Sequence, residues 1–231
     1  MKVEIWSDIA CPWCYVGKRR FEKALASFPQ RDEVDVVWRS FELDPTAPRR
    51  QSEPQSVLLA RKYRVPLAQA EAMNASMTAA AASEGLDFHF ERVQVGNTFD
   101  AHRLIHFAAA AGRREEMVER LFSAYLTDGE ALGDIDVLVR LAEEVGLDPH
   151  AARESLRGDA FADAVRADES RAHAFGISGV PFFAIDEAIG VSGAQPPEAL
   201  VAAMHQAMFH TDAAEVSDAS PAVCNEDGCE V

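Results

Sequence analysis

The feature that most constrains the fold is a pair of cysteines at the junction between a strand-like and a helix-like segment. Side chains of two kinds alternate along residues 2–7, which is the two-residue periodicity of a β-strand. Residues 17–28 carry apolar side chains at helical spacing. Cys11 and Cys14 lie between the two segments. This order predicts a β-α start with both cysteines at the first turn of the helix.

The motif Cys11-Pro12-Trp13-Cys14 suits nucleophilic sulfur chemistry. A thiolate, not a thiol, attacks a disulfide, and the free N–H groups and dipole at a helix N-terminus stabilise negative charge. Pro12 fits the first helical turn, so Cys11 is predicted to cap the helix and to be the nucleophile. Cys14, about one turn further on, would pair with Cys11 or resolve a mixed disulfide, and would be the more buried sulfur. Trp13 either packs against the protein or offers a substrate an apolar contact.

The rest of the chain predicts one sheet interrupted by a helical insertion. Residues 34–41 are rich in β-branched and aromatic side chains and form a second strand. Residues 55–157 show helical spacing broken by glycines. Residues 182–191 predict a β-hairpin, and a last helix follows over 197–208. A β-α-β start and a β-β-α finish on either side of a helical block are typical of an α/β fold with an inserted domain.

These segments divide the chain into three predicted parts. The sheet-containing domain is discontinuous and comprises residues 1–50 and 158–209. Residues 51–157 form the inserted helical domain. Residues 210–231 are small, acidic and without periodicity, so they are predicted to be a flexible tail.

The predicted tail carries a second cysteine pair, Cys224 and Cys229, separated by four residues that include a turn-forming glycine. Three interpretations stay open: an auxiliary redox pair that exchanges electrons with Cys11 and Cys14, a weak metal site, or an inert end. A flexible segment of about twenty residues is long enough to reach the first pair. A zinc site built from all four cysteines conflicts with a reactive setting for Cys11, so no metal is expected at the first cysteine pair.

Charge and composition exclude several classes of protein. The chain has 22 basic and 38 acidic side chains and a formal net charge of −16, which repels phosphate backbones and anionic lipid surfaces. We expect neither nucleic acid nor a membrane as a partner. The first eight residues carry charges where a signal peptide needs an apolar run, so a cytoplasmic protein is expected. In the reducing cytosol a cysteine pair is more often catalytic or metal-binding than structural.

Several motifs together resemble a known group of proteins. The Cys-Pro-x-Cys sequence on the first helix, the helical insertion and Val180-Pro181 before a hairpin are similar to the DsbA group of the thioredoxin superfamily. Residues 6–17, 97–103 and 179–183 look like its cytosolic FrnE-like branch, and the resemblance covers residues 2 to about 208. It implies an α/β fold in which a thioredoxin-like mixed sheet carries an inserted all-helical domain.

The resemblance also implies a substrate-binding loop. The Val180–Pro181 bond would be cis and would face the cysteines, leaving the backbone of Val180 free to pair with an extended substrate segment. Taken alone, a proline at the start of a strand is ordinary. Pro12 and Trp13 would join these two residues in binding substrate.

Three further residues are candidates for lining the cleft: Asn97, His102 and Arg103. They open a helix of the predicted insertion. Helix capping and packing are common roles for residues of these types and are the favoured explanation, so we do not interpret them as catalytic.

We therefore predict thiol-disulfide exchange by the Cys11 thiolate, through a mixed disulfide that Cys14 resolves. The net reaction could be oxidation, reduction or isomerisation, because the motif does not set the reduction potential. Protein or small-molecule thiols and disulfides are the expected partners. Beyond the redox-active disulfide, no tightly bound cofactor is expected.

Two alternatives remain. Kappa-class glutathione transferases and 2-hydroxychromene-2-carboxylate isomerases resemble the chain over the same stretches, but their active position carries serine. Cysteine at positions 11 and 14 favours dithiol exchange, with glutathione kept as a candidate co-substrate. A chaperone-like binding protein, in which the helical block holds unfolded chains, is the non-enzymatic alternative.

Overall fold

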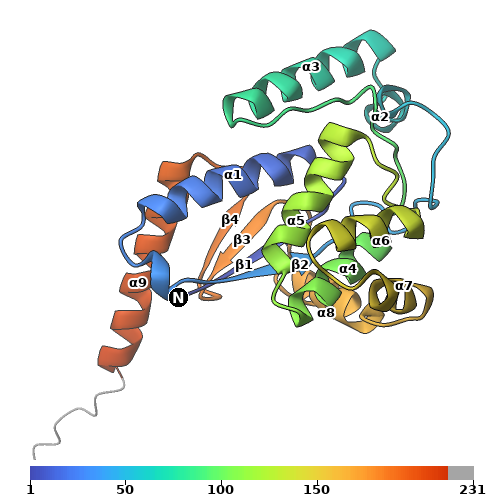
Figure 1. Ribbon diagram of the computed structural model, residues 1–231. Helices are drawn as coiled ribbons and strands as arrows, with labels where there is room; N and C mark the ends of the chain where they lie inside the picture. Colours follow the sequence, from blue (N-terminus) through green and yellow to red (C-terminus); the bar gives the residue numbers. More distant parts are fainter. Residues whose placement is uncertain (218–231) are drawn as a thin grey trace, which may run out of the picture.

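The computed structural model describes residues 1–217 and contains a four-stranded mixed sheet. Its strands are β1 (Lys2–Ser7), β2 (Asp35–Ser40), β3 (Phe182–Ile185) and β4 (Ile189–Ser192), in the order β2-β1-β3-β4. The first two strands are parallel, whereas β3 is antiparallel to both β1 and β4. The ends of β1 and β2 and the start of β3 therefore meet at one edge of the sheet (Figure 1).

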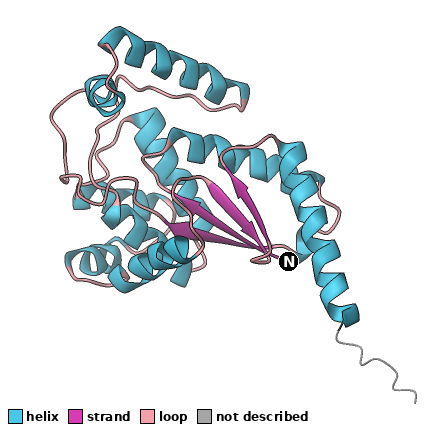
Figure 2. Cartoon of the chain, turned by 180° about the vertical axis from the view of Figure 1, so that it is seen from behind, coloured by secondary structure: helices cyan, strands magenta, loops and turns pink. Residues whose placement is uncertain are grey.

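Helices cover both faces of this sheet (Figure 2). On one face, the ring of Phe183 stacks on Phe21 of α1 (Pro12–Ser27), with ring centroids 5.7 Å apart. On the other face, Trp6 packs in a cluster with Ala172 of α8 (Ala162–Ala174). The two faces alternate along β1 and β3 because successive strand side chains point in opposite directions.

The segment between β2 and β3 is helical, as the sequence predicts. A short 3-10 turn, η1 (Arg31–Glu33), precedes β2. The elements between β2 and β3 are α2 (Gln55–Tyr63), α3 (Leu67–Ser83), α4 (Phe99–Ala110), α5 (Arg114–Ser123), a π-helical turn η2 (Ala124–Asp128), α6 (Ile135–Glu144), α7 (Pro149–Arg157) and α8. Figure 1 shows α2 and α3 extending beyond the helices that cover the sheet, and α2 has no buried side chain. Within residues 1–217 no helix combines the length and the apolarity needed to cross a bilayer.

Three helices have ends that need comment. Helix α5 ends at Ser123, where the chain continues into the π-helical turn η2. Helix α8 begins at Ala162, because Phe161 before it adopts a left-handed conformation with φ 63°. The last helix, α9 (Pro197–Ser217), runs past the expected end at Met208 into the segment predicted as a tail. No glycine or proline lies between Met208 and Ser217, so nothing in the sequence stops the helix there.

Candidate active site

Cys11 is the N-cap of α1, and Pro12 is the first residue of that helix. The backbone N–H of Cys11 donates to the carbonyl oxygen of Asp8 (3.0 Å), and the N–H of Cys14 donates to that of Cys11 (3.0 Å). These bonds tighten the turn between β1 and α1 and fix both sulfurs at the helix N-terminus. The two thiols are free, Cys14 is more buried than Cys11 (1% against 7% exposed), and Trp13 between them is 46% exposed.

The loop before β3 lies against Cys11. The Val180–Pro181 peptide bond is cis, and the Cys11 thiol donates to the carbonyl oxygen of Val180 over 3.6 Å. Among the described residues no group accepts a hydrogen bond from the backbone N–H of Val180. The carbonyl oxygen of Pro181, in contrast, accepts from the backbone N–H of Gly193 in the hairpin. The structure thus brings Cys11, Val180 and Pro181 together and leaves a backbone donor beside them.

Gly17 allows this loop to approach the helix. A Cβ atom at position 17 would lie 2.9 Å from Cγ of Pro181, closer than real Cβ contacts allow. Only a glycine at the second turn of α1 fits against the proline ring without displacement. Gly17 therefore sets the spacing between the helix that carries the cysteines and the loop that faces them.

The turn that leads to the two cysteines contains a buried acid, Asp8. The carboxylate of Asp8 accepts from the backbone N–H groups of Ala10 (3.1 Å) and Leu43 (2.7 Å). Nε2 of His102 is 3.5 Å from Oδ1 of Asp8, and both side chains are almost fully buried. Burial opposes ionisation, but His102 and the two backbone N–H groups outweigh it and lower the pKa of Asp8.

The environment keeps Cys14 protonated. Burial, together with the hydrogen bond and charge of Cys11, raises the pKa of Cys14 well above its ordinary value. The charge of Asp8 adds to this effect. Burial and the same aspartate also raise the pKa of Tyr125, on the π-helical turn. Cys14 is thus a neutral thiol that needs a proton acceptor before it can attack.

The three candidate cleft residues on or before α4 have different surroundings. The side-chain oxygen of Asn97 caps α4 by accepting from the N–H of Phe99 (2.9 Å), and its amide donates to Glu42 (3.3 Å). Arg103 is buried and donates to four carbonyl oxygens near the end of α7, those of Ser155, Leu156, Gly158 and Ala160. Of the three, only His102 contacts Asp8, the buried acid in the turn before the cysteines.

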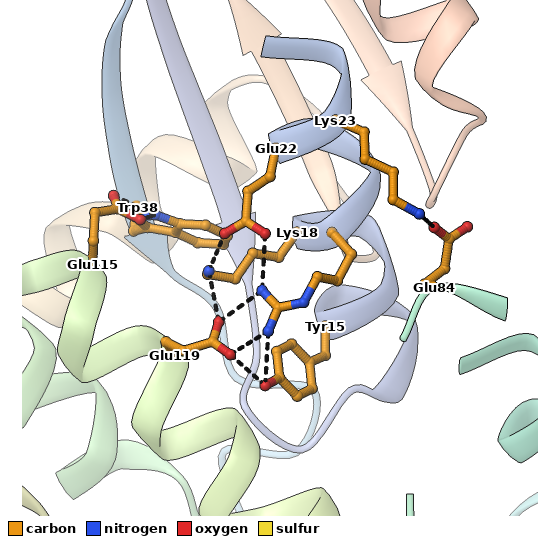
Figure 3. Close-up of polar contacts among 9 residues, drawn as sticks. Tyr15, Lys18, Glu22, Lys23, Trp38, Glu84, Glu115 and Glu119 are labelled. Carbon is orange, nitrogen blue, oxygen red and sulfur yellow. Dashed lines mark hydrogen bonds and ion pairs between the residues drawn. The ribbon is translucent and has the colours of Figure 1, made fainter. Parts of the chain in front are cut away.

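An ionic cluster attaches α1 to α5 of the inserted block (Figure 3). Glu119 accepts from Tyr15 (2.6 Å) and Lys18 (2.7 Å) of α1, and it also pairs with Arg19. Although burial acts in the opposite direction, these donors lower the pKa of Glu119 to about 2. The cluster fixes the orientation of the helix that carries Cys11 and Cys14.

Exposed apolar side chains flank the cysteines. Trp13 follows Pro12 on α1, and Leu43, whose backbone is held to Asp8, is 40% exposed. Within residues 1–217 no group of three or more histidine, cysteine or acidic side chains could hold a metal ion. Cys224 and Cys229 lie outside the described residues.

Asp8, Gly17 and Glu119 were not identified from the sequence. Asp8 looked like the end of a strand, although its position three residues before the first cysteine could have suggested a role. Gly17 interrupts a good helical pattern, which often signals close packing. Nothing local links Glu119 to α1, 100 residues earlier.

Comparison with known proteins places these features in context. The sequence matches the DSBA-like thioredoxin domain family over residues 2–205. It is 31% identical over 191 residues to the uncharacterized protein YwbO of Bacillus subtilis (strain 168), covering 81% of this chain and 88% of YwbO. The crystal structure of the probable DsbA oxidoreductase SCO1869 from Streptomyces coelicolor superposes with a TM-score of 0.87 and 45% identity, over 100% of this chain and 99% of that one.

A more distant structure shares the fold. The cytosolic disulfide reductase DsbM from Pseudomonas aeruginosa, solved with GSH, superposes with a TM-score of 0.60. The alignment covers 93% of this chain and 100% of DsbM at 16% identity. At this identity the likeness concerns the fold alone.

Proposed function

The chain belongs to the family of DSBA-like thioredoxin domains, and we propose that it is a thiol-disulfide oxidoreductase that acts through Cys11 and Cys14. The observation that carries the proposal is the position of Cys11. Cys11 occupies the N-cap position of α1, and its sulfur lies 3.6 Å from the carbonyl oxygen of Val180. A helix N-terminus stabilises a thiolate, and the neighbouring loop offers a backbone to hold a substrate beside it.

In the proposed reduction of a substrate, the Cys11 thiolate attacks one sulfur of the substrate disulfide. A mixed disulfide forms, and the other substrate sulfur leaves as a thiolate that takes a proton from solvent. Cys14 loses its proton and attacks Cys11, which releases the second substrate thiolate and forms the Cys11–Cys14 disulfide. Two electrons pass from the protein to the substrate, and the reverse sequence oxidises a dithiol.

The substrate would bind across the loop and the exposed apolar side chains. The free N–H of Val180 can pair with an extended segment beside the reacting disulfide. Pro12 and Trp13 would contact the substrate on the helix side, and Leu43, on the segment held to Asp8, would add an apolar contact. Protein and small-molecule thiols and disulfides are the proposed partners, in the cytoplasm, with no tightly bound cofactor.

The assignment to the FrnE-like branch stays a prediction. Glutathione is proposed as a candidate co-substrate. DsbM, which shares the fold, was solved with GSH. A glutathione-linked transferase or isomerase would form products without cycling a Cys11–Cys14 disulfide. A chaperone would suppress aggregation even with Cys11 replaced by serine. An assay for glutathione-dependent product formation and an assay for suppression of aggregation therefore separate the two alternatives.

Trapping of the mixed disulfide tests the proposal. In Cys14→Ser the second step is blocked, so a peptide disulfide is expected to leave one covalent peptide adduct on Cys11, identified by mass spectrometry without reductant. Wild type should accumulate no adduct under the same conditions. An adduct on another residue, or none, would contradict the proposal.

Cys224 and Cys229 are proposed as an auxiliary redox pair on chemical grounds alone. The double variant Cys224→Ser/Cys229→Ser is expected to keep the first turnover of Cys11 and to slow repeated turnover. Unchanged repeated turnover would favour the metal-site or inert interpretations of the pair, and metal-binding measurements would distinguish these two.

A further inference from the structure

The side chain of Arg20 connects α1 to two segments that are distant from it in the sequence. Arg20 lies on α1, beyond Gly17, and its Nε donates to Oε1 of Glu84 (2.7 Å), the residue that caps the end of α3. Its Nη1 donates to the backbone carbonyl oxygen of Ala194 (2.6 Å), in the turn between β4 and α9. Arg20 therefore links the helix that carries the cysteines both to the inserted helical block and to the hairpin.

The turn that contains Ala194 holds the loop opposite the cysteines. The backbone N–H of Gly193 donates to the carbonyl oxygen of Pro181 (2.8 Å), which follows the cis peptide bond. The carbonyl oxygen of Val180, one residue earlier, accepts from the thiol of the proposed nucleophile over 3.6 Å. A series of contacts thus runs from Arg20 through this turn to the loop whose free N–H is proposed to bind substrate.

The guanidinium makes a contact with Ala194 that the backbone does not make. No backbone N–H of residues 1–217 donates to the carbonyl oxygen of Ala194, so Arg20 supplies its hydrogen bond. A guanidinium is a planar fork with several donors, and it can bind a carboxylate through one N–H and a carbonyl through another at the same time. An ion pair that only attached α3 to α1 would not need this second contact.

Lys23 provides a direct comparison. It lies about one turn further along α1, and its Nζ donates to Oε2 of the same Glu84 (2.6 Å; Figure 3). Burial opposes ionisation of Glu84, but hydrogen bonds from Lys23 and Arg20 outweigh it and lower the pKa of Glu84. The side chain of Lys23 is half exposed. The two cations therefore share one carboxylate, and of the two only Arg20 also contacts the turn at Ala194.

We propose that Arg20 is a positioning residue for substrate binding, which holds the Val180–Pro181 loop where its backbone can pair with a peptide substrate beside the cysteines. Glu84, from the inserted block, orients the guanidinium for this contact. The inference rests on the proposed function and deepens it, because it assigns part of the affinity for peptide disulfides to a contact outside the cysteine motif. A small disulfide without a peptide backbone cannot pair with Val180 in this way, so its reaction depends much less on Arg20.

Kinetics with two substrates test this inference. Arg20→Met removes both contacts, and Arg20→Lys keeps a cation but cannot reproduce the forked pair of contacts. Both variants are expected to raise KM for a peptide disulfide about fivefold or more, the effect of losing roughly one hydrogen bond, with little change in kcat. Turnover of 2-hydroxyethyl disulfide should change much less. A role limited to stability would lower the turnover of both substrates alike.

Two further variants separate the turn from the attachment of α3. Lys23→Met removes one partner of Glu84 and leaves the turn untouched, so KM for the peptide should stay near the wild-type value. Glu84→Gln keeps a neutral acceptor for Arg20 but not the charge, so it should raise KM less than Arg20→Met does. Together with Arg20→Lys, this milder change tests the inference even if Arg20→Met does not fold.

Amide hydrogen exchange at Gly193 reports on the turn without any substrate. The N–H of Gly193 is the donor to Pro181, so it should exchange faster once the turn is released. Faster exchange is expected in Arg20→Met and Arg20→Lys, whereas Lys23→Met should exchange at the wild-type rate. This measurement does not depend on any redox activity of the protein.

The outcomes distinguish this inference from the proposed function. A folded Arg20→Met or Arg20→Lys with the wild-type KM for the peptide, equal losses with both disulfides, or the same rise in KM in Lys23→Met would each overturn the role of Arg20. An unchanged KM in Glu84→Gln would overturn the role of Glu84. A wild-type protein that turns over neither disulfide would overturn the proposed function and the role in substrate binding with it, whereas exchange at Gly193 would still show whether Arg20 holds the turn.

Discussion

The thiol of Cys11 lies 3.6 Å from the carbonyl oxygen of Val180, although the two residues are 169 positions apart in the sequence. Strand β1 leads into the turn that carries Cys11, and β3, its antiparallel neighbour, starts just after Pro181. The register that pairs Trp6 with Phe182 therefore also brings the cysteine and the loop together. The pairing of β1 with β3 therefore assembles the candidate site from two segments that are far apart in the sequence.

Gly17→Ala should lower both stability and turnover. In an unobstructed helix the same change stabilises by up to ~1 kcal/mol. Here the added methyl group would meet the ring of Pro181 at 2.9 Å, and overpacking of this kind costs about 1–3 kcal/mol. Chemical denaturation and turnover of a small disulfide would measure the two effects.

Gly179→Ala is the matched control, because a Cβ at position 179 meets no atom within 4 Å. It should unfold at nearly the wild-type denaturant concentration. A Gly17→Ala variant as stable and active as wild type would show that the proximity of α1 to Pro181 is unimportant.

Glu4→Gln should destabilise the fold at neutral pH and less so in acid. Burial opposes ionisation of Glu4, but hydrogen bonds from Arg171 and Arg39 lower its pKa from 4.5 to about 2. Since the folded-state pKa is depressed, the stabilisation is present above the unfolded value and is lost as the pH falls toward 2. This lowering of the pKa of Glu4 corresponds to a contribution of about 3 kcal/mol to the free energy of unfolding at neutral pH.

The control for Glu4 is Glu53→Gln, which removes the exposed ion pair with Arg61. Exposed pairs contribute little to stability, so its unfolding midpoint should stay near wild type at every pH. Equal destabilisation of Glu4→Gln at pH 7 and pH 3 would contradict the assigned ionisation.

Trp13→Ala should affect substrate binding more than stability. The side chain is 46% exposed, and an exposed tryptophan beside a reacting cysteine is a natural contact for a peptide. We expect kcat/KM for a peptide disulfide to fall about five- to tenfold, which corresponds to ~1 kcal/mol of lost binding. Turnover of a small disulfide should change less.

Phe209→Ala, at a 73% exposed position on α9, is the control for loss of an exposed aromatic ring. It should behave like wild type in both assays. A Trp13→Ala protein that processes the peptide normally would assign Trp13 no role in substrate binding.

The local part of the site could be predicted from the sequence. Strand periodicity before Cys11, and Pro12 after it, are short-range signals, and the structure places Cys11 at the helix cap as they indicate. The mixed sheet also followed from the order of strand-like and helix-like segments. The position of Val180 opposite Cys11 needed the resemblance, because no local pattern specifies a contact across so much of the chain.

Neighbouring residues on α4 show why the rest could not be predicted. His102 and Arg103 are adjacent in the sequence, but adjacent side chains on a helix point about 100° apart. One of them reaches Asp8, and the other caps the end of α7. Which of the two would face the cysteines depends on how the insertion packs, and that depends on distant contacts such as Glu119 with Lys18.

The most direct test of the central claim is turnover of a small disulfide by Cys11→Ser compared with wild type, after both are shown to be folded. The account predicts that the variant loses more than ~1,000-fold in turnover, as removal of a catalytic nucleophile does. Turnover by Cys11→Ser at the wild-type rate would contradict the assignment of Cys11 as the nucleophile and leave the glutathione-linked and chaperone alternatives in its place.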